Sequence, residues 1–329
     1  MLWSKRNCLS PTAAECLLLR MTWLLARSLS RIAGFGAILG FPVWSIHEVR
    51  HAVVRWALMR LLPVQVLMHR AAAGPSPNDR AMDPERVWIF WWQGMDAAPP
   101  LVQACVDSVR ANFPEREVVI LDKFNVREFA FLPESRFSEV ASGSLSVTHF
   151  SDIVRMNVLS SWGGLWVDAT VLAVASAPVP KGKFGFVSRR GPHCASNVNV
   201  ARQRWATYFI GGPADWELWR FVENGLNCYF DRFDLLIDYH LFDYLLDLAY
   251  YLNIGRFREA VDSLPPTNAG IHDLTRSGPS GRVRSRETSL YKLSWKDEPW
   301  ASMTAIDVER FRFVVGIGVD GQLPPNQSQ

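Results

Sequence analysis

Two acids and an arginine stand close together in one stretch of the chain, Ser151 to Thr170, which reads SDIVRMNVLSSWGGLWVDAT. Asp152 and Arg155 lie one helical turn apart, and their simplest interpretation is an ordinary ion pair. Asp168 follows a short apolar run. In an open α/β sheet a carboxylate at the carboxyl end of a strand lies where ligands bind. The sequence therefore favours a functional role for Asp168, with a structural hydrogen-bonding role as the main alternative.

Local spacing predicts the elements that hold these side chains. Apolar residues recur at helical intervals from His149 to Trp162, and Ser151 is a candidate for the capping residue of this helix. Gly163 and Gly164 end the helix, because a left-handed turn favours glycine. The run Leu165 to Val167 then predicts a short buried strand that carries the acid to the edge of the sheet.

The preceding segment predicts a parallel pair of strands. Val87 to Trp92 is wholly apolar and ends at Gln93-Gly94, as expected of a buried strand. Leu101 to Phe113 has one apolar helical face, and Glu117 to Leu121 is a second strand. A strand, a helix and a strand in this order form a βαβ unit, so we expect an α/β domain.

Residues 1–80 differ in charge from the rest of the chain. They contain 10 Lys or Arg and three Asp or Glu, a net charge of +7, whereas the remainder carries −4 of the total of +3. Leu17 to Trp44 is apolar but interrupted by arginines. Its longest uncharged run, 32–46, is shorter than the roughly 20 residues of a membrane-spanning helix. This extension is therefore predicted to lie on a surface rather than to span a membrane.

A second segment, Val49 to Met68, places Arg50, Arg55 and Arg60 among apolar residues, as in a basic amphipathic helix at an anionic bilayer. A helical hairpin packed on the following domain is the alternative. The five cysteines are scattered and odd in number, which indicates no disulfide framework and favours a reducing compartment. We expect a cytoplasmic protein associated peripherally with the inner face of the membrane.

The domain boundary is predicted in the segment AAAGPSPNDRAMDP, residues 71–84, which is rich in Ala, Pro and Gly. The expected organisation is a helical extension over 1–80, an α/β domain over 81–300, and a C-terminal strand with a polar tail over 301–329. The chain contains no GxGxxG, GxxxxGK[ST], GxSxG or HExxH motif. Dinucleotide-binding, P-loop, serine hydrolase and zincin signatures are thus absent.

The sequence resembles the glycosyltransferases with a DXD motif that include the capsular polysaccharide synthesis proteins. Three blocks carry the resemblance: VWIFWWQG at 87–94, the stretch 151–170, and YKLSWK at 291–296. The resemblance implies a GT-A-like (Rossmann-like) nucleotide-sugar-binding domain with a mixed central sheet. It also implies a hexosyltransferase that acts on a glycan or lipid-linked saccharide. Because the wider family is retaining, the resemblance implies retention of the anomeric configuration.

The resemblance assigns roles to individual residues. Asp152 would accept hydrogen bonds from donor-sugar hydroxyls, Arg155 would place positive charge near the sugar or phosphate, and Asp168 would bind the donor and approach a metal. The further residues expected at the nucleotide sugar are Trp91, Gly94, Gly163, Gly164, Lys292 and Lys296. The acidic segment 238–243 is a weaker candidate for substrate contact, with helix capping as its alternative.

Thr170 stands where the family pattern has its second acid, so the motif reads Asp-Ala-Thr. A hydroxyl is a weaker ligand for Mn²⁺ or Mg²⁺ than a carboxylate, and a metal at Asp168 and Thr170 is therefore an open expectation. Without a metal, Arg155, Lys292 and Lys296 would have to neutralise the leaving diphosphate. The alternative function is a non-catalytic nucleotide-sugar-binding or scaffold protein of a polysaccharide assembly complex, and a toxin-like transferase acting on protein is a third. No nucleic-acid partner is expected.

Overall fold

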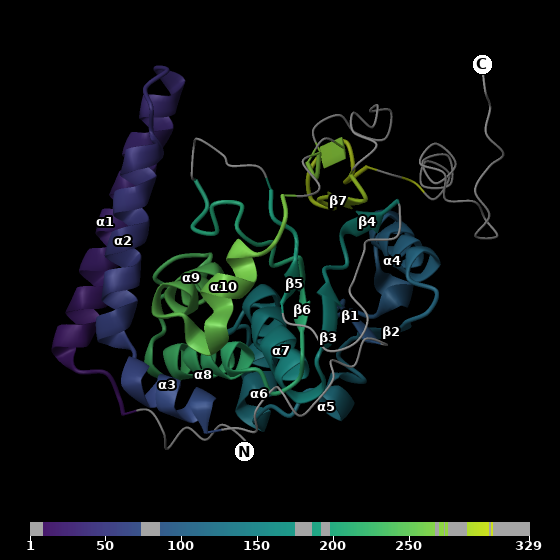
Figure 1. Cartoon of the computed structure of the whole chain (residues 1–329), viewed down its shortest axis with the longest axis horizontal. Coiled ribbons are helices and arrows are strands. Elements are labelled where there is room, and N and C mark those ends of the chain that lie inside the picture. The colour runs from purple at the N-terminus through teal and green to yellow at the C-terminus, as the bar shows by residue number, and fades with distance from the viewer. Residues whose placement is uncertain are drawn as a thin grey trace.

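The computed structural model describes most of the chain (Figure 1). The described residues are 9–73, 86–174, 186–191, 198–266, 270–272, 274–275, 288–302 and 304. Most of the expected linker and of the expected C-terminal strand and tail, as well as His193 and Cys194, lie outside them. The three-part division of the chain therefore stays a prediction.

Three helices form the amino-terminal part, as expected: α1 (Ala13–Ile38), α2 (Trp44–Leu61) and α3 (Val64–Ala72). Thr12 and Glu15 cap α1 reciprocally, each side chain bonding the other's backbone N–H. The helices α1 and α2 lie side by side as a hairpin along one edge of the molecule (Figure 1), and α3 packs on α8. None of the helices in the described ranges is both long and apolar enough to cross a membrane.

A mixed five-stranded sheet forms the centre, in the order β2-β1-β3-β6-β5. Its strands are β1 (Arg86–Phe90), β2 (Glu117–Leu121), β3 (Gly164–Val167), β5 (Val187–Ser188) and β6 (Phe209–Gly212). Strand β1 is parallel to β2 and to β3, whereas β6 runs antiparallel to both β3 and β5. Two further strands, β4 (Val171–Ala173) and β7 (Leu290–Lys292), pair as an antiparallel ribbon. The predicted α/β class with a mixed sheet behind a helical extension is confirmed.

Helices cover both faces of the sheet. These are η3 (Met95–Ala97), α4 (Pro100–Asn112), α5 (Val126–Phe129), α6 (Glu134–Ser142), α7 (Val147–Trp162), α8 (Glu217–Arg232), α9 (Leu241–Leu252), η4 (Ile254–Arg256) and α10 (Phe257–Asp262). Trp88 and Phe90 pack in the large core with α7 and α8, while Ile89 packs in a second core with α4. Side chains thus alternate between the two faces of β1, as expected of a strand. The predicted βαβ unit is β1, α4 and β2.

The start of α7 differs from the prediction. Ser146, not Ser151, is the capping residue, and its side chain accepts a hydrogen bond from the backbone N–H of His149. Ser151 lies inside the helix, one turn further on. The extra turn is possible because Ser146 satisfies a donor of the first turn, which leaves the Ser151 hydroxyl unused for capping.

Gly163 and Gly164 join α7 to β3 in a crowded turn. Their φ angles are +69° and +97°, a region that side chains other than glycine rarely adopt. A Cβ atom would lie 2.7 Å from the backbone nitrogen of Ala214 if added at Gly163, and 2.8 Å from the carbonyl oxygen of Arg86 if added at Gly164. The two glycines thus allow the close approach of α7, β1 and the segment after β6.

Gly164→Ala is expected to lower the free energy of unfolding by roughly 3 kcal/mol, because backbone strain and a backbone clash act together. Gly143→Ala is the matched control, since Gly143 also has a positive φ of +78° but no atom within 4 Å of an added Cβ. We expect it to cost only about 1 kcal/mol. Urea unfolding of both variants measures the difference, and equal losses would contradict the role of the close approach.

Helix α2 is fastened to the α/β domain by a buried carboxylate. Asp247 of α9 is 1% exposed and accepts hydrogen bonds from Arg55 of α2 and from Arg204, both at 2.6 Å. Arg202, which lies 3.7 Å from the same carboxylate, also binds Glu48 of α2 with two hydrogen bonds. Three guanidinium groups around one buried acid hold this helix in a defined position.

The arginines of α2 therefore have a different use from the one predicted. Arg55 points to Asp247, and Arg50 donates to Ser30 of α1 and to the carbonyl of Val198. Neither is free to face a bilayer as part of a basic amphipathic helix, because both bridge the hairpin internally or to the domain. The alternative, a helical hairpin packed on the domain, describes the contacts of α2.

The scattered cysteines indicated no disulfide bond, and this expectation is wrong. Cys228 of α8 is disulfide-bonded, whereas Cys16 is a free thiol. An odd number of scattered cysteines does not exclude a single pair, since residues far apart in the sequence can meet in the fold.

Candidate active site

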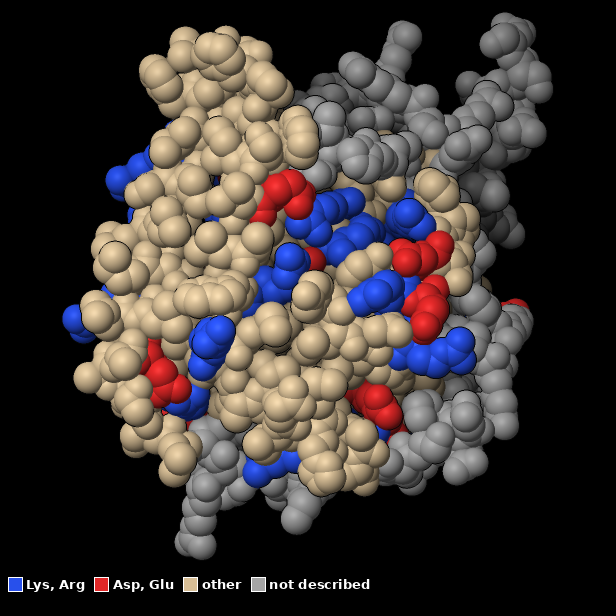
Figure 2. Space-filling model, turned by 60° about the vertical axis from the view of Figure 1, so that its left-hand side comes forward, with Lys and Arg blue, Asp and Glu red and all other residues tan. Residues whose placement is uncertain are grey.

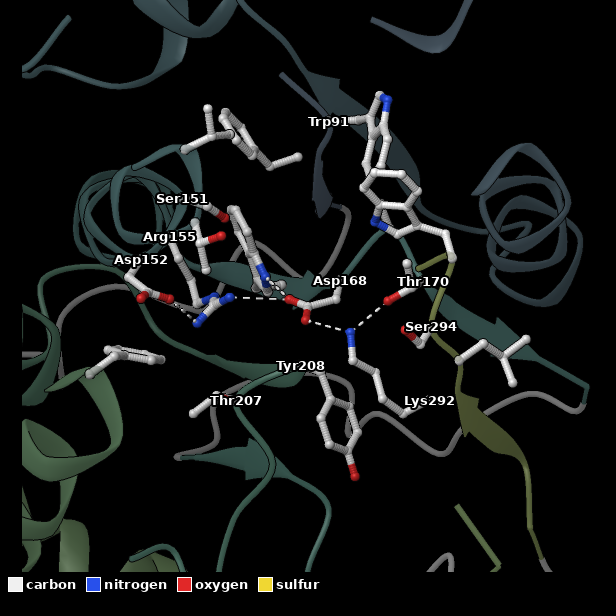
Figure 3. Close-up of a pocket in the computed structure, with 18 of the residues that line it drawn as sticks. Trp91, Ser151, Asp152, Arg155, Asp168, Thr170, Thr207, Tyr208, Lys292 and Ser294 are labelled. Atoms are coloured by element: carbon white, nitrogen blue, oxygen red, sulfur yellow. Dashed lines mark hydrogen bonds and ion pairs between the residues drawn. The ribbon is translucent and has the colours of Figure 1, made fainter. Parts of the chain in front are cut away.

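The main cavity of the described structure lies at the carboxyl ends of β1 and β3. Its volume is about 690 Å³, within the range of small-molecule binding sites. Residues from β1, α7, β3, α9 and the ribbon of β4 and β7 line it. Figure 3 shows Ser151, Asp152 and Arg155 of α7 on one side of the cavity, with Asp168, the residue that follows β3, near its centre. This is the edge where the sequence placed the site.

Asp168 is the centre of the cavity's charge network. One of its oxygens, Oδ1, accepts hydrogen bonds from Arg155 at 3.1 Å and from the indole of Trp166 at 2.9 Å. The other, Oδ2, accepts one from the ammonium of Lys292 at 2.9 Å. Burial alone would raise the pKa of this carboxyl, but Lys292 and Arg155 outweigh it and lower the pKa to about 2. Asp168 is therefore a fixed negative charge.

Lys292 reaches the site from a strand far along the chain. In the ribbon Lys292 pairs with Val171, and the backbone N–H of Leu293 bonds the carbonyl of Thr170. This register places the Lys292 ammonium 2.6 Å from the Thr170 hydroxyl while it also binds Asp168 (Figure 3). The ammonium thus lies between the first and third residues of the Asp-Ala-Thr motif.

Arg155 is held inside the pocket by rings and acids. It donates to Asp152 at 3.0 Å, and its guanidinium lies 4.8 Å from the ring centres of both Trp166 and Phe242. Its Nε atom is buried and has no hydrogen-bond partner among the described residues. A buried donor without a partner is costly, so this atom is available to a bound ligand. The guanidinium is fixed in place before any ligand arrives.

Asp152 differs from Asp168 in its charge state. Its side chain is 14% exposed, and burial raises its pKa to about 7, although Arg155 opposes the shift and the nearby Asp168 and Asp243 add to it. Asp243 of α9 also lines the cavity, where the Trp205 indole donates to it at 3.0 Å and burial raises its pKa. One acid is fixed as an anion while its neighbours hold protons readily.

Unfolding at different pH values tests the raised pKa of Asp152. The folded state binds a proton on Asp152 up to about pH 7, whereas the unfolded chain releases it near 3.8, so this group destabilises the fold increasingly as pH rises through that window. Relative to wild type, Asp152→Asn should gain stability with rising pH, by at most about 1.4 kcal/mol per pH unit. Urea unfolding at pH 5, 6, 7 and 8 measures this, and parallel curves would contradict the assignment.

Aromatic side chains form the opposite wall of the cavity. Trp91 follows β1, and its ring meets that of Trp295 edge to face, with 5.6 Å between ring centres. Trp295 is 38% exposed, and the Lys296 ammonium lies 5.3 Å from its ring centre. Flat apolar rings next to a cation suit a planar heterocycle that carries negative charge.

Most of the predicted site residues meet in this cavity. Those that line it are Trp91, Asp152, Arg155, Asp168, Thr170, Lys292 and Lys296. Gly94, Gly163 and Gly164 are not among the lining residues. The glycine pair lies at the opposite end of β3 from Asp168, against backbone atoms, so we assign it to packing rather than to ligand contact. Gly94 precedes η3 and has a positive φ of +87°.

Two lining residues carry no signal in the sequence. Thr207 and Tyr208 precede β6, and the Tyr208 carbonyl accepts the backbone N–H of Asp168. No motif marks them, because their place depends on the pairing of β6 with β3. In the segment 238–243, Tyr239, His240 and Asp243 line the cavity, although α9 begins only at Leu241. The apolar spacing of the segment had indicated helix throughout.

A divalent cation does not fit the arrangement of Asp168 and Thr170. The described residues include no group of three or more His, Cys, Asp or Glu side chains that could hold a metal ion. Between the two expected ligands lies the ammonium of Lys292, within hydrogen-bond distance of both. A dication at that position would be repelled by the lysine and held by one carboxylate only.

Fold and cavity together define an α/β protein with a charged cavity at the carboxyl edge of its sheet. Fixed cations, hydrogen-bonding acids and tryptophan rings meet there. The chain belongs to the capsular polysaccharide synthesis protein family, whose pattern matches residues 67–303. The matched range takes in β1, the stretch from Ser151 to Thr170 and β7, that is, every part of the cavity described above.

Two further proteins are similar to this chain. The O-glycosyltransferase braB of Annulohypoxylon truncatum is 30% identical over 124 residues, which cover 34% of this chain and 30% of that protein. The chain therefore matches less than a third of that relative's length. The solved structure of the PaToxG glycosyltransferase covers 84% of this chain and 92% of its own, with 15% identity and a TM-score of 0.30. A TM-score of this size does not establish a shared fold.

Proposed function

We propose that this protein is a glycosyltransferase that transfers a sugar from a nucleoside-diphosphate sugar to a hydroxyl of a glycan or lipid-linked saccharide. The observation that carries the proposal is the position of Asp168, held between Arg155 and Lys292 at the carboxyl end of β3. The family membership, with its role in capsular polysaccharide synthesis, and the glycosyltransferase name of the braB relative support it.

Each part of a nucleotide sugar has a matching wall in the cavity. The base stacks against Trp91 and Trp295, whose rings form the apolar side. The diphosphate lies near Lys292 and Lys296, because two ammonium groups line that end of the cavity. The sugar hydroxyls bond to the carboxylate of Asp168 and to the carboxyl group of Asp152, both of which Arg155 positions.

We propose that Lys292 performs the work of the divalent cation. The bond between the anomeric carbon and the diphosphate oxygen breaks, and its electron pair stays on the diphosphate. A cation next to that oxygen lowers the barrier by stabilising the charge that develops there. Lys292 offers such a cation and is held in place by Asp168 and Thr170 before the donor binds.

The acceptor hydroxyl then forms the new bond to the anomeric carbon, and its proton passes to the departing diphosphate. Transfer on the same face as departure needs no separate base and retains the anomeric configuration, as the family resemblance implies. Proton NMR of the first product formed from an α-linked donor decides the stereochemistry. An α-linked product supports retention, and a β-linked product contradicts it.

Slow hydrolysis of a panel of UDP- and GDP-sugars tests the function itself. We expect release of nucleoside diphosphate from at least one donor. The rate should be the same with and without EDTA at about 5 mM, a concentration well above that of trace metal. No turnover of any donor, together with tight binding of the nucleotide, would instead establish the non-catalytic nucleotide-sugar-binding protein.

A further inference from the structure

The end of the α1–α2 hairpin carries an apolar surface that no other described part of the protein covers. Six large apolar side chains around its turn are between 52% and 82% exposed: Ile32, Phe35, Ile38, Leu39, Phe41 and Trp44. We call residues 32–46 the hairpin tip. The tip contains no charged residue. Six large exposed side chains on one small surface are unusual, because soluble surfaces carry such residues singly.

The tip projects beyond the rest of the molecule. The hairpin rises past α9 and α10 (Figure 1), and the space-filling view shows its end as an uncharged knob with blue side chains only lower down (Figure 2). With a rise of about 1.5 Å per residue, the eight steps from Arg31 to Leu39 span about 12 Å. That length is close to the depth of the boundary between lipid headgroups and acyl chains, about 5 to 10 Å.

Three backbone donors of the turn are satisfied internally. The N–H groups of Leu39, Gly40 and Phe41 bond the carbonyls of Phe35, Ala37 and Gly36, and Pro42 has no N–H. Gly40 makes this possible by adopting a φ of +76°. Lipid offers no partner to unsatisfied backbone groups, so these three bonds lower the cost of moving the turn into the acyl region.

The charges below the tip are complementary to an anionic bilayer. Arg27 and Arg31, in the two turns of α1 next to the tip, are exposed. The two acids of the hairpin, Glu15 and Glu48, are bound by Arg232 and Arg202 of the domain. The hairpin thus presents free cations and neutralised acids, and each cation near an anionic surface adds to binding.

We propose that the hairpin tip inserts into one leaflet of an anionic membrane. The occupant of the apolar surface is lipid rather than protein. The tip is a convex knob, backbone hydrogen bonds form within its turn, and exposed arginines lie next to it. This differs from the surface-lying amphipathic helix expected from the sequence, because α1 and α2 stand on the membrane by their shared end. It agrees with the expected peripheral association.

Insertion fixes the cavity relative to the membrane. The clamp between Asp247 and Arg55 joins the hairpin to α9, and α9 contributes Phe242 and Asp243 to the cavity. Strands β4 and β7, which border the cavity, lie at the end of the molecule toward which the hairpin rises (Figure 1). If the proposed function holds, this orientation favours an acceptor carried by a lipid over a free sugar.

Flotation of the full-length protein with vesicles tests the insertion. The probes are vesicles of phosphatidylcholine, either pure or with roughly 30% phosphatidylglycerol. At this anionic content the attraction of cations to the surface is strong. Wild type should float with the anionic vesicles. Phe35→Ser/Phe41→Ser should bind at least tenfold more weakly, because two large apolar side chains leave the lipid. Arg27→Gln/Arg31→Gln should lose affinity for the anionic vesicles only.

Phe124→Ser/Phe131→Ser is the matched control, since both rings are exposed, at 76% and 48%, but lie outside the hairpin. Its flotation should equal that of wild type. Equal flotation of the tip variant and wild type overturns the proposal. A second result would also overturn the proposal: light scattering finds a dimer for wild type and a monomer for the tip variant, and wild type does not bind vesicles. In that case a second copy of the chain covers the tip. Donor hydrolysis, measured without vesicles, reports separately on the proposed function.

Discussion

Replacement of Asp168 by asparagine is expected to reduce donor hydrolysis by at least about 10³-fold, with the protein still folded. The carboxylate accepts three hydrogen bonds, from Arg155, Trp166 and Lys292, and its charge holds both cations at the donor site. An amide of the same shape keeps part of this network but removes the charge. Initial rates of nucleoside diphosphate release, with thermal unfolding as the check on folding, measure the effect.

A surface acid provides the comparison for Asp168. Asp107 of α4 is 46% exposed and forms an i,i+3 ion pair with Arg110, so Asp107→Asn removes the same charge far from the cavity. Its activity should stay within twofold of wild type, as expected for an exposed pair that contributes little. Hydrolysis by Asp168→Asn within tenfold of wild type would show that the carboxylate does not serve the reaction.

Replacement of Lys292 by methionine is expected to lower kcat about 10²- to 10³-fold, the range found when one charge-stabilising group is removed. Methionine keeps most of the length of the lysine but cannot stabilise a departing diphosphate. Added Mn²⁺ should not restore activity, because Thr170 is a weak ligand. Steady-state rates with and without Mn²⁺ give this result.

A second variant tests whether the site can be made to depend on a metal ion. Lys292→Met/Thr170→Asp removes the ammonium and supplies a second carboxylate, which gives the site two acids for a hard cation. We expect it to hydrolyse the donor only when Mn²⁺ is present. Lys123→Met, an exposed lysine beside Phe124, is the control and should be unaffected. Loss of wild-type activity in EDTA would overturn the role of Lys292.

The close connection between sequence and local structure explains which elements were predicted well. Strand β2 has the bounds expected, and α7 ends at Trp162 as predicted, because apolar periodicity and a glycine stop act over a few residues. The cap of α7 was misplaced by five residues. Two serines, Ser146 and Ser151, satisfy the local pattern equally, and only the packing of the first turn selects between them.

In the amino-terminal extension, too, the local pattern predicts the helices but not the contacts of their side chains with distant residues. Its helices and its lack of a long uncharged run were visible in the composition. The arginines of α2 were not assigned correctly, because Arg55 finds Asp247 at a separation of 192 residues. Charge pattern alone cannot distinguish an arginine that faces lipid from one that binds a buried acid.

Local sequence is enough to predict the α/β class and the family, and the candidate site residues Asp152, Arg155 and Asp168 lie within one short helix, turn and strand. Only the tertiary structure decided what stands beside Asp168. The ribbon of β4 and β7 brings Lys292 to Thr170 over 122 residues, and no local rule predicts that register. Strand pairing over such a distance depends on the whole core, and this pairing places an ammonium at the position where the sequence left a metal ion an open question.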